Sequence, residues 1–104
     1  MQANAIISFY QRFKSDILSG KKTITIRNEV ESQYGSKTIL DAVTFEEGRY
    51  FAKLELLSIA PVQFNELNEA HATAENMTLV ELKNVISEIY PNEKQLYVLT
   101  FRLT

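Results

Sequence analysis

Hydrophobic residues recur with helical spacing at the start of the chain. Phe9, Phe13 and Ile17 stand four residues apart and are separated by mostly polar residues, which is the spacing of one face of an α-helix. Ser8 precedes this stripe as a candidate N-cap, and Gly20 follows it at a position where a glycine often ends a helix. The pattern therefore predicts a short helix as the first element.

A second helical pattern occupies the later part of the chain. Residues 78–81 (TLVE) form a capping-box signature, and apolar residues then recur every three or four positions. The residue before a proline disfavours helical geometry, so this helix is predicted to end at Tyr90, before Pro91. A shorter helix is predicted within the polar stretch 64–74.

Alternation of apolar and polar residues with period two predicts β-strands. Residues 46–48 (EEG) separate two such stretches as a hairpin-like turn, and Pro61 is predicted to end the longer one, because proline cannot donate a ladder hydrogen bond. Strands with few intervening helices favour a mainly antiparallel sheet, so the expected fold is an α+β protein with a small curled sheet or barrel and helices at its ends. The strands are predicted over residues 23–26, 38–45, 49–59 and 95–103.

Composition narrows the possible chemistry. The chain has 104 residues, which suits one domain over residues 1–104. It has no cysteine and a single histidine, His71, so disulfides, cysteine-type zinc sites and multi-histidine metal sites are excluded and neither a metal nor a cofactor is expected. No apolar run is long enough to cross a bilayer and no signal-peptide pattern is present, so we expect a cytoplasmic protein without a membrane partner.

The charge balance bears on nucleic-acid binding. The formal net charge is −2 and the isoelectric point is near 5.4. Proteins that hold long nucleic acids neutralise several phosphates with basic residues, so long nucleic acid is not an expected partner. Residues 20–27 (GKKTITIR) are the one candidate for a local basic patch.

Residues 23–27 can be interpreted in two ways. Alternate side chains share a face of a strand, so Thr23, Thr25 and Arg27 lie on one face and the two isoleucines on the other. On the pattern alone, the commoner interpretation is a half-buried strand with a polar outer face. The alternative is a catalytic site in which the Thr25 hydroxyl is a nucleophile beside a lysine base and an arginine.

A lysine base must be neutral to accept a proton. Its pKa has to fall from about 10.4 to roughly 7–8, and burial and a nearby guanidinium both act in that direction. Strand parity favours Lys21, which would share a face with Thr25. Lys22 would serve instead if the chain bends at Gly20 before the strand becomes regular, so the residues themselves leave both lysines open.

The segment GKKTITIR resembles the G-x-K-x-x-E-x-R signature of ASCH domains, which are similar to the PUA domains of RNA-modifying proteins. Gly20, Lys22 and Arg27 match it, whereas Thr25 stands where the broader family usually has glutamate. That departure, together with residues 71–83 and 89–101, resembles the YqfB-type subfamily of N(4)-acetylcytidine amidohydrolases. The resemblance covers nearly the whole chain.

The resemblance implies both a fold and a reaction. The fold would be a PUA-like (ASCH) small β-barrel with flanking helices, and the reaction would be hydrolysis of N(4)-acetylcytidine to cytidine and acetate. It implies that Lys22 is the general base, Thr25 the nucleophile and Glu75 the general acid, and that Arg27 holds the substrate or the developing oxyanion. By sequence alone, Glu75 is an ordinary acidic residue between two predicted helices.

A non-catalytic PUA-like RNA-binding module is the alternative function. Thr25 in place of the family glutamate favours the enzyme, because a binding module gains little from a nucleophile. The acidic balance also favours a small nucleoside substrate, which brings no phosphates, over long RNA.

Overall fold

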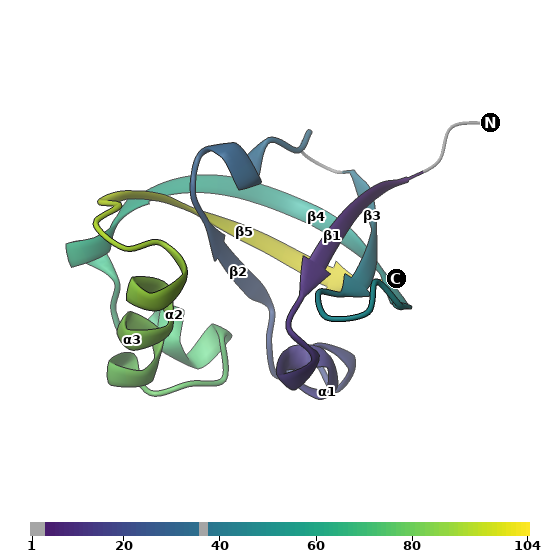
Figure 1. Ribbon diagram of the computed structural model, residues 1–104, viewed down its shortest axis with the longest axis horizontal. Helices are drawn as coiled ribbons and strands as arrows, with labels where there is room; N and C mark the ends of the chain where they lie inside the picture. The colour runs from purple at the N-terminus through teal and green to yellow at the C-terminus, as the bar shows by residue number, and fades with distance from the viewer. Residues whose placement is uncertain (1–3, 36–37) are drawn as a thin grey trace.

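The computed structural model describes residues 4–35 and 38–104, and it confirms the α+β class (Figure 1). Two α-helices, α2 and α3, lie together at one end of a curled sheet, and α1 lies near the ends of β1 and β2. In chain order the elements are β1 (Ala5–Phe9), the 3₁₀ helix η1 (Gln11–Phe13), α1 (Lys14–Leu18), β2 (Ile24–Arg27), the 3₁₀ helix η2 (Val30–Ser32), β3 (Ile39–Thr44), β4 (Tyr50–Gln63), the 3₁₀ helix η3 (Phe64–Glu66), α2 (Glu69–Ala74), α3 (Leu79–Ile89) and β5 (Gln95–Leu103).

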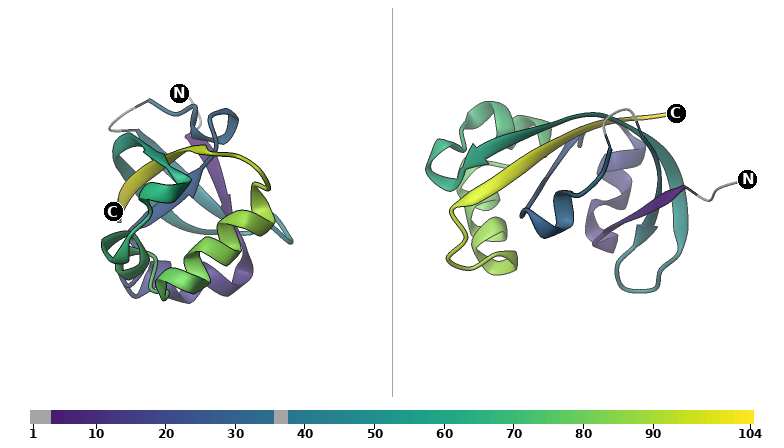
Figure 2. Two further views of the ribbon diagram at one scale, coloured as in Figure 1. Left: turned by 90° about the vertical axis from the view of Figure 1, so that its left-hand side faces the viewer. Right: turned by 90° about the horizontal axis from the view of Figure 1, so that it is seen from above.

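The five strands form one mixed sheet in the order β1-β3-β4-β5-β2. β1 pairs with β3 in parallel, and the other three pairings are antiparallel. β4 is 14 residues long and pairs with β3 and with β5, and these long strands curve together around the molecule (Figure 2).

The two edge strands, β1 and β2, do not pair within the described residues, so the curled sheet does not close into the barrel that the resemblance implies. We call this unpaired boundary between β1 and β2 the seam. One side-chain hydrogen bond crosses it, from Arg27 Nη2 on β2 to the Ser8 carbonyl on β1, at 2.7 Å.

The N-terminal helix prediction is wrong in its first half. Residues 5–9 are the strand β1, and α1 begins only at Lys14. Phe9, Phe13 and Ile17 have helical spacing because all three contribute to one core cluster from three successive elements. The predicted ending is confirmed, since Gly20 has a positive φ of 80°.

The prediction that Pro61 ends a strand is also wrong. β4 continues through Pro61, opposite Tyr97, to Gln63. The pairing of β3 with β4 ends at Glu55, so the second part of β4 has one ladder partner, and such an edge tolerates a proline.

The second half of the chain follows the predicted elements closely. α3 has Thr78 as its N-cap in a complete capping box with Glu81, and Tyr90 is its C-cap. β5 has the predicted bounds. No helix in the described part of the chain is long and apolar enough to cross a membrane.

The core consists of two clusters of buried residues. One lies under β1, β3, β4, β5 and α1, and includes Phe9, Leu54 and Leu56; the other lies between β2, α2 and α3, and includes Ile24 and Ile26. Val98 on β5 is partly buried and packs against the second cluster.

Candidate active site

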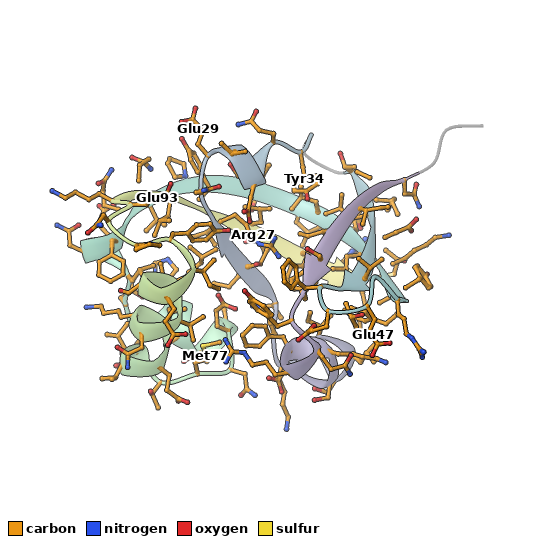
Figure 3. The ribbon with its side chains drawn as sticks, viewed as in Figure 1. Arg27, Glu29, Tyr34, Glu47, Met77 and Glu93 are labelled. Carbon is orange, nitrogen blue, oxygen red and sulfur yellow. The ribbon has the colours of Figure 1, made fainter. Side chains whose placement is uncertain are left out.

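A cavity of about 420 Å³ opens along the seam, and both core clusters contribute to its walls. All four residues singled out from the sequence line it: Lys22, Thr25, Arg27 and Glu75. In Figure 3, Arg27 lies between β2 and β1, with Tyr34 above it and Met77 below it, and both of these neighbours also line the cavity.

The turn after α1 decides which of the two lysines enters the cavity. Gly20 takes a left-handed conformation, and the Asp16 carbonyl then accepts hydrogen bonds from both the Lys21 N–H (2.9 Å) and the Lys22 N–H (3.0 Å). The regular strand starts only at Ile24, so strand parity does not extend back to the lysines. Lys21 is exposed, whereas Lys22 is only 3% exposed.

The Lys22 side chain ends in an apolar and aromatic surrounding. Its Nζ donates a hydrogen bond to the Ile24 carbonyl at 2.8 Å. The same nitrogen lies 5.1 Å from the centroid of the Phe13 ring and 6.0 Å from that of Phe9. Water has little access to the amine there, so the charged form loses most of its hydration.

This environment lowers the pKa of Lys22 from 10.5 to about 7. Burial is the largest cause, the positive charge of Arg27 acts in the same direction, and the carboxylate of Asp16 acts against both. Lys22 therefore gives up its proton much more readily than a solvated lysine does, as a lysine base requires.

The end of α2 directs Glu75 toward the same cavity. Glu75 is the C-cap residue, and Asn76 follows it with a positive φ of 57°. The Asn76 N–H donates to the Thr73 carbonyl at 3.0 Å and the Met77 N–H donates to the Ala72 carbonyl at 2.9 Å, which is the Schellman arrangement of a helix end. The Glu75 side chain is thereby fixed in the interior, where it is only 4% exposed.

A backbone contact aligns the two elements that carry Lys22 and Glu75. The Thr23 N–H donates to the Ala74 carbonyl at 2.8 Å, so the start of β2 lies against the end of α2. The Lys22 Nζ contacts Glu75 Oε1, and both side chains are buried.

Thr25 and Arg27 share one face of β2, as strand parity predicts, but that face lines the cavity and not solvent. Thr25 is only 5% exposed, so the interpretation of a polar outer face is wrong. Arg27 Nε donates to Thr25 Oγ1 at 2.9 Å, and the Arg27 guanidinium lies 5.1 Å from the centroid of the Phe9 ring. No hydrogen bond joins Lys22 directly to Thr25 within the described residues.

Sequence reasoning missed two further polar residues of the cavity. Glu31 on η2 and Tyr90 at the end of α3 line it, and the Tyr90 hydroxyl donates to Glu31 Oε1 at 2.6 Å. Glu31 lies in the polar stretch 28–37 and Tyr90 is the predicted end of a helix, and neither pattern signals that the two residues meet. The described residues contain no group of three or more histidine, cysteine, aspartate and glutamate residues that could hold a metal ion.

Sequence comparison finds close relatives of nearly the full length. An N(4)-acetylcytidine amidohydrolase of Vibrio vulnificus is 53% identical over 102 residues, which cover 98% of each chain. An N(4)-acetylcytidine amidohydrolase of Haemophilus influenzae is 50% identical over 103 residues, which cover 99% of this chain and 98% of the relative. No family model matches the chain.

Structure comparison finds ASCH domains at low sequence identity. The ASCH domain from Lactobacillus crispatus aligns with a TM-score of 0.79 and 14% identity over 95% of this chain and 79% of that one. The ASCH protein from Zymomonas mobilis aligns with a TM-score of 0.75 and 15% identity over 93% and 65% of the two chains. The chain therefore has the fold of ASCH domains.

Proposed function

The chain belongs to the N(4)-acetylcytidine amidohydrolase family and is a hydrolase, and we propose that it cleaves N(4)-acetylcytidine to cytidine and acetate in the cavity along the seam. The observation that carries this proposal is the buried group of a hydroxyl (Thr25), an amine with a pKa lowered to about 7 (Lys22) and a carboxyl group (Glu75) around one cavity. Amide hydrolysis needs a nucleophile, a base that activates it and an acid that protonates the leaving nitrogen.

In the first step, Thr25 Oγ1 attacks the carbonyl carbon of the acetyl group. Its proton passes to neutral Lys22, directly or through one water molecule. The hydrogen bond from Arg27 Nε to Thr25 Oγ1 orients the oxygen and favours its negatively charged form. Arg27 Nη1 makes only a 3.8 Å contact with Glu31 among the described residues, so this nitrogen is free to donate to the developing oxyanion.

In the second step, the tetrahedral intermediate collapses and the C–N bond breaks. Glu75 gives its proton to the departing N4 atom, which leaves cytidine and an acetyl ester on Thr25. A water molecule, deprotonated by the Glu75 carboxylate, then attacks the ester, and acetate leaves as protonated Lys22 returns its proton to Thr25 Oγ1.

The contact between Lys22 and Glu75 supports this division of roles. An ionised carboxylate in contact with Lys22 would favour the ammonium form, so in this mechanism Glu75 carries the proton while Lys22 is neutral. One proton shared by the pair thus supplies a base and an acid together. Such a pair titrates as a unit, and its pH profile belongs to both residues.

Turnover by the purified protein, followed by the loss of substrate absorbance, is the direct test. We expect Thr25→Ala to remove the acetyl-enzyme seen by mass spectrometry after a rapid acid quench, and Lys22→Ala and Glu75→Gln to lower kcat/KM by about 10²–10⁴. Lys21→Ala is the matched control and should retain activity, because Lys21 is exposed.

Two results would contradict the assignment of roles. A large loss of kcat/KM in Lys21→Ala with near-normal turnover in Lys22→Ala would show that Lys21 is the base. Near-normal turnover in Thr25→Ala would exclude the covalent route and leave direct attack by water.

We also propose that the substrate is a free nucleoside and not long RNA. The net charge of −2 supports this, because long RNA is bound mainly through its phosphates. RNA affinity that falls steeply with salt, without nucleoside turnover, would instead favour an RNA-binding module.

A further inference from the structure

The polar residues of the cavity are ordered from its inner end to its mouth. Lys22 is 3% exposed and Thr25 is 5% exposed, whereas Arg27 is 13% and Glu31 is 51% exposed. Each residue contacts the next from Thr25 outward, through the Arg27 guanidinium to Glu31. A substrate whose acetyl carbonyl reaches Thr25 therefore extends past Arg27 toward Glu31.

In N(4)-acetylcytidine, the acetyl amide and the ribose are attached at opposite sides of the cytosine ring. When the amide is at the inner end of the cavity, the ribose is at the mouth. The group that the substrate presents there carries hydroxyls, which need hydrogen-bond acceptors.

Glu31 is an acceptor held in place at that mouth. Its Oε1 receives the Tyr90 hydroxyl at 2.6 Å and lies 3.8 Å from Arg27 Nη1. Its backbone N–H donates to Asn28 Oδ1 at 2.9 Å, which fixes the start of η2. Among the described residues nothing bonds to Oε2, and an ionised carboxylate only accepts hydrogen bonds.

Tyr90 is a positioning residue for this carboxylate. Its side chain is buried, and both burial and the hydrogen bond to Glu31 raise its pKa. It therefore keeps its proton and remains a donor throughout the working pH range. The other oxygen, Oε2, has no hydrogen-bond partner among the described residues and is left to bind a ligand.

We propose that Glu31, positioned by Tyr90, binds the 2′ and 3′ hydroxyls of the ribose and makes the site selective for ribonucleosides over the free base. This inference rests on the proposed function, because it takes the reacting amide to be at Thr25. A vicinal diol presents two donors to one carboxylate, and hydrogen bonds to a charged group are stronger than those between neutral groups.

The test compares N(4)-acetylcytidine with N(4)-acetylcytosine, which lacks the ribose. We expect Glu31→Gln to raise KM for the nucleoside about tenfold while kcat changes by less than about twofold, and to leave KM for the base unchanged, because the variant loses only the hydrogen bonds from the ribose to a charged group. Tyr90→Phe should give a smaller rise in KM for the nucleoside alone. For N(4)-acetyl-2′-deoxycytidine, which lacks the 2′ hydroxyl, Glu31→Gln should raise KM less than it does for N(4)-acetylcytidine.

Glu29→Gln is the matched control, because Glu29 is exposed, precedes η2 directly and does not line the cavity. An equal rise of KM for nucleoside and base in Glu31→Gln would overturn the ribose contact, as would no rise for either. If the wild type hydrolyses neither compound, the proposed reaction fails. In that case, binding of cytidine and cytosine measured by calorimetry tests the contact between Glu31 and the ribose separately. The contact is supported only if Glu31→Gln weakens the binding of cytidine and leaves that of cytosine unchanged.

Discussion

Replacing Asp16 by asparagine tests whether the neutral form of Lys22 controls the rate. The carboxylate of Asp16 raises the pKa of Lys22, against the larger lowering by burial and by Arg27. Asp16 does not line the cavity, and its backbone carbonyl, which accepts the Lys21 and Lys22 N–H groups, is the same in the variant. The change therefore removes one charge near the base without touching the substrate.

The expected effect is a gain of activity at low pH. With a pKa of about 7, roughly one Lys22 in ten is neutral at pH 6. A charge interaction in a partly solvated setting is worth on the order of 1 kcal/mol, so the pKa should fall by about 0.7. About a third of the lysines are then neutral at pH 6, and kcat/KM should be about threefold higher than in the wild type.

The assay is the pH dependence of kcat/KM for N(4)-acetylcytidine between pH 5 and pH 9, at constant low ionic strength. The wild-type acid limb should have its midpoint near pH 7, and the two curves should converge above pH 8. Added salt should shrink the difference, because it screens the charge of Asp16. If the midpoint of the acid limb of kcat/KM is unchanged or higher in Asp16→Asn than in the wild type, the assignment of Lys22 as the base is refuted.

Three further predictions concern cooperation, helix termination and the core. The double change Lys22→Ala with Thr25→Ala should lower kcat/KM little more than either single change, because the effects of residues that act as one catalytic unit are not additive. If the two losses multiply in the double variant, the residues act independently and the prediction is wrong. Asn76→Ala should unfold in denaturant with a free energy about 1 kcal/mol below that of Asn76→Gly, because both lose the side chain but only glycine accepts the φ of 57° without strain; equal stabilities would show that the helix end is not strained. Leu54→Ala, at a fully buried position, should cost about 2–5 kcal/mol of unfolding free energy, and a loss below 1 kcal/mol would mean that the surrounding core collapses to fill the space.

The elements that the sequence predicted well are those whose signals are local. The capping box at Thr78 and the alternation from Gln95 to Leu103 lie within the segments that they define. β1 is different, because its partner is β3, and Ile7 pairs with Ala42, thirty-five residues later. The spacing of Phe9, Phe13 and Ile17 reflects their shared core cluster and not the geometry of one element, so the pattern predicts a helix where the strand lies.

The residues of the candidate site also differ in whether a local sequence pattern predicts their position. Strand parity placed Thr25 and Arg27 on one face from local pattern alone. The choice of Lys22 over Lys21 depends on two hydrogen bonds to the Asp16 carbonyl, and the burial of Glu75 depends on a helix end. Neither the turn nor the helix end produces a periodic pattern of apolar and polar residues. Only the family resemblance therefore indicates Lys22 and Glu75 from the sequence.

The open seam makes Arg27 part of the fold as well as of the site. Its guanidinium joins the Ser8 carbonyl on one edge strand to the Thr25 hydroxyl on the other, and β1 has β3 as its one ladder partner among the described strands. Local opening of an edge strand requires less free energy than global unfolding. If β1 detaches, Arg27 loses its hydrogen bond to Ser8, so in the proposed mechanism the orientation of the Thr25 hydroxyl depends on an N-terminal strand that itself contributes no attacking or proton-transferring group.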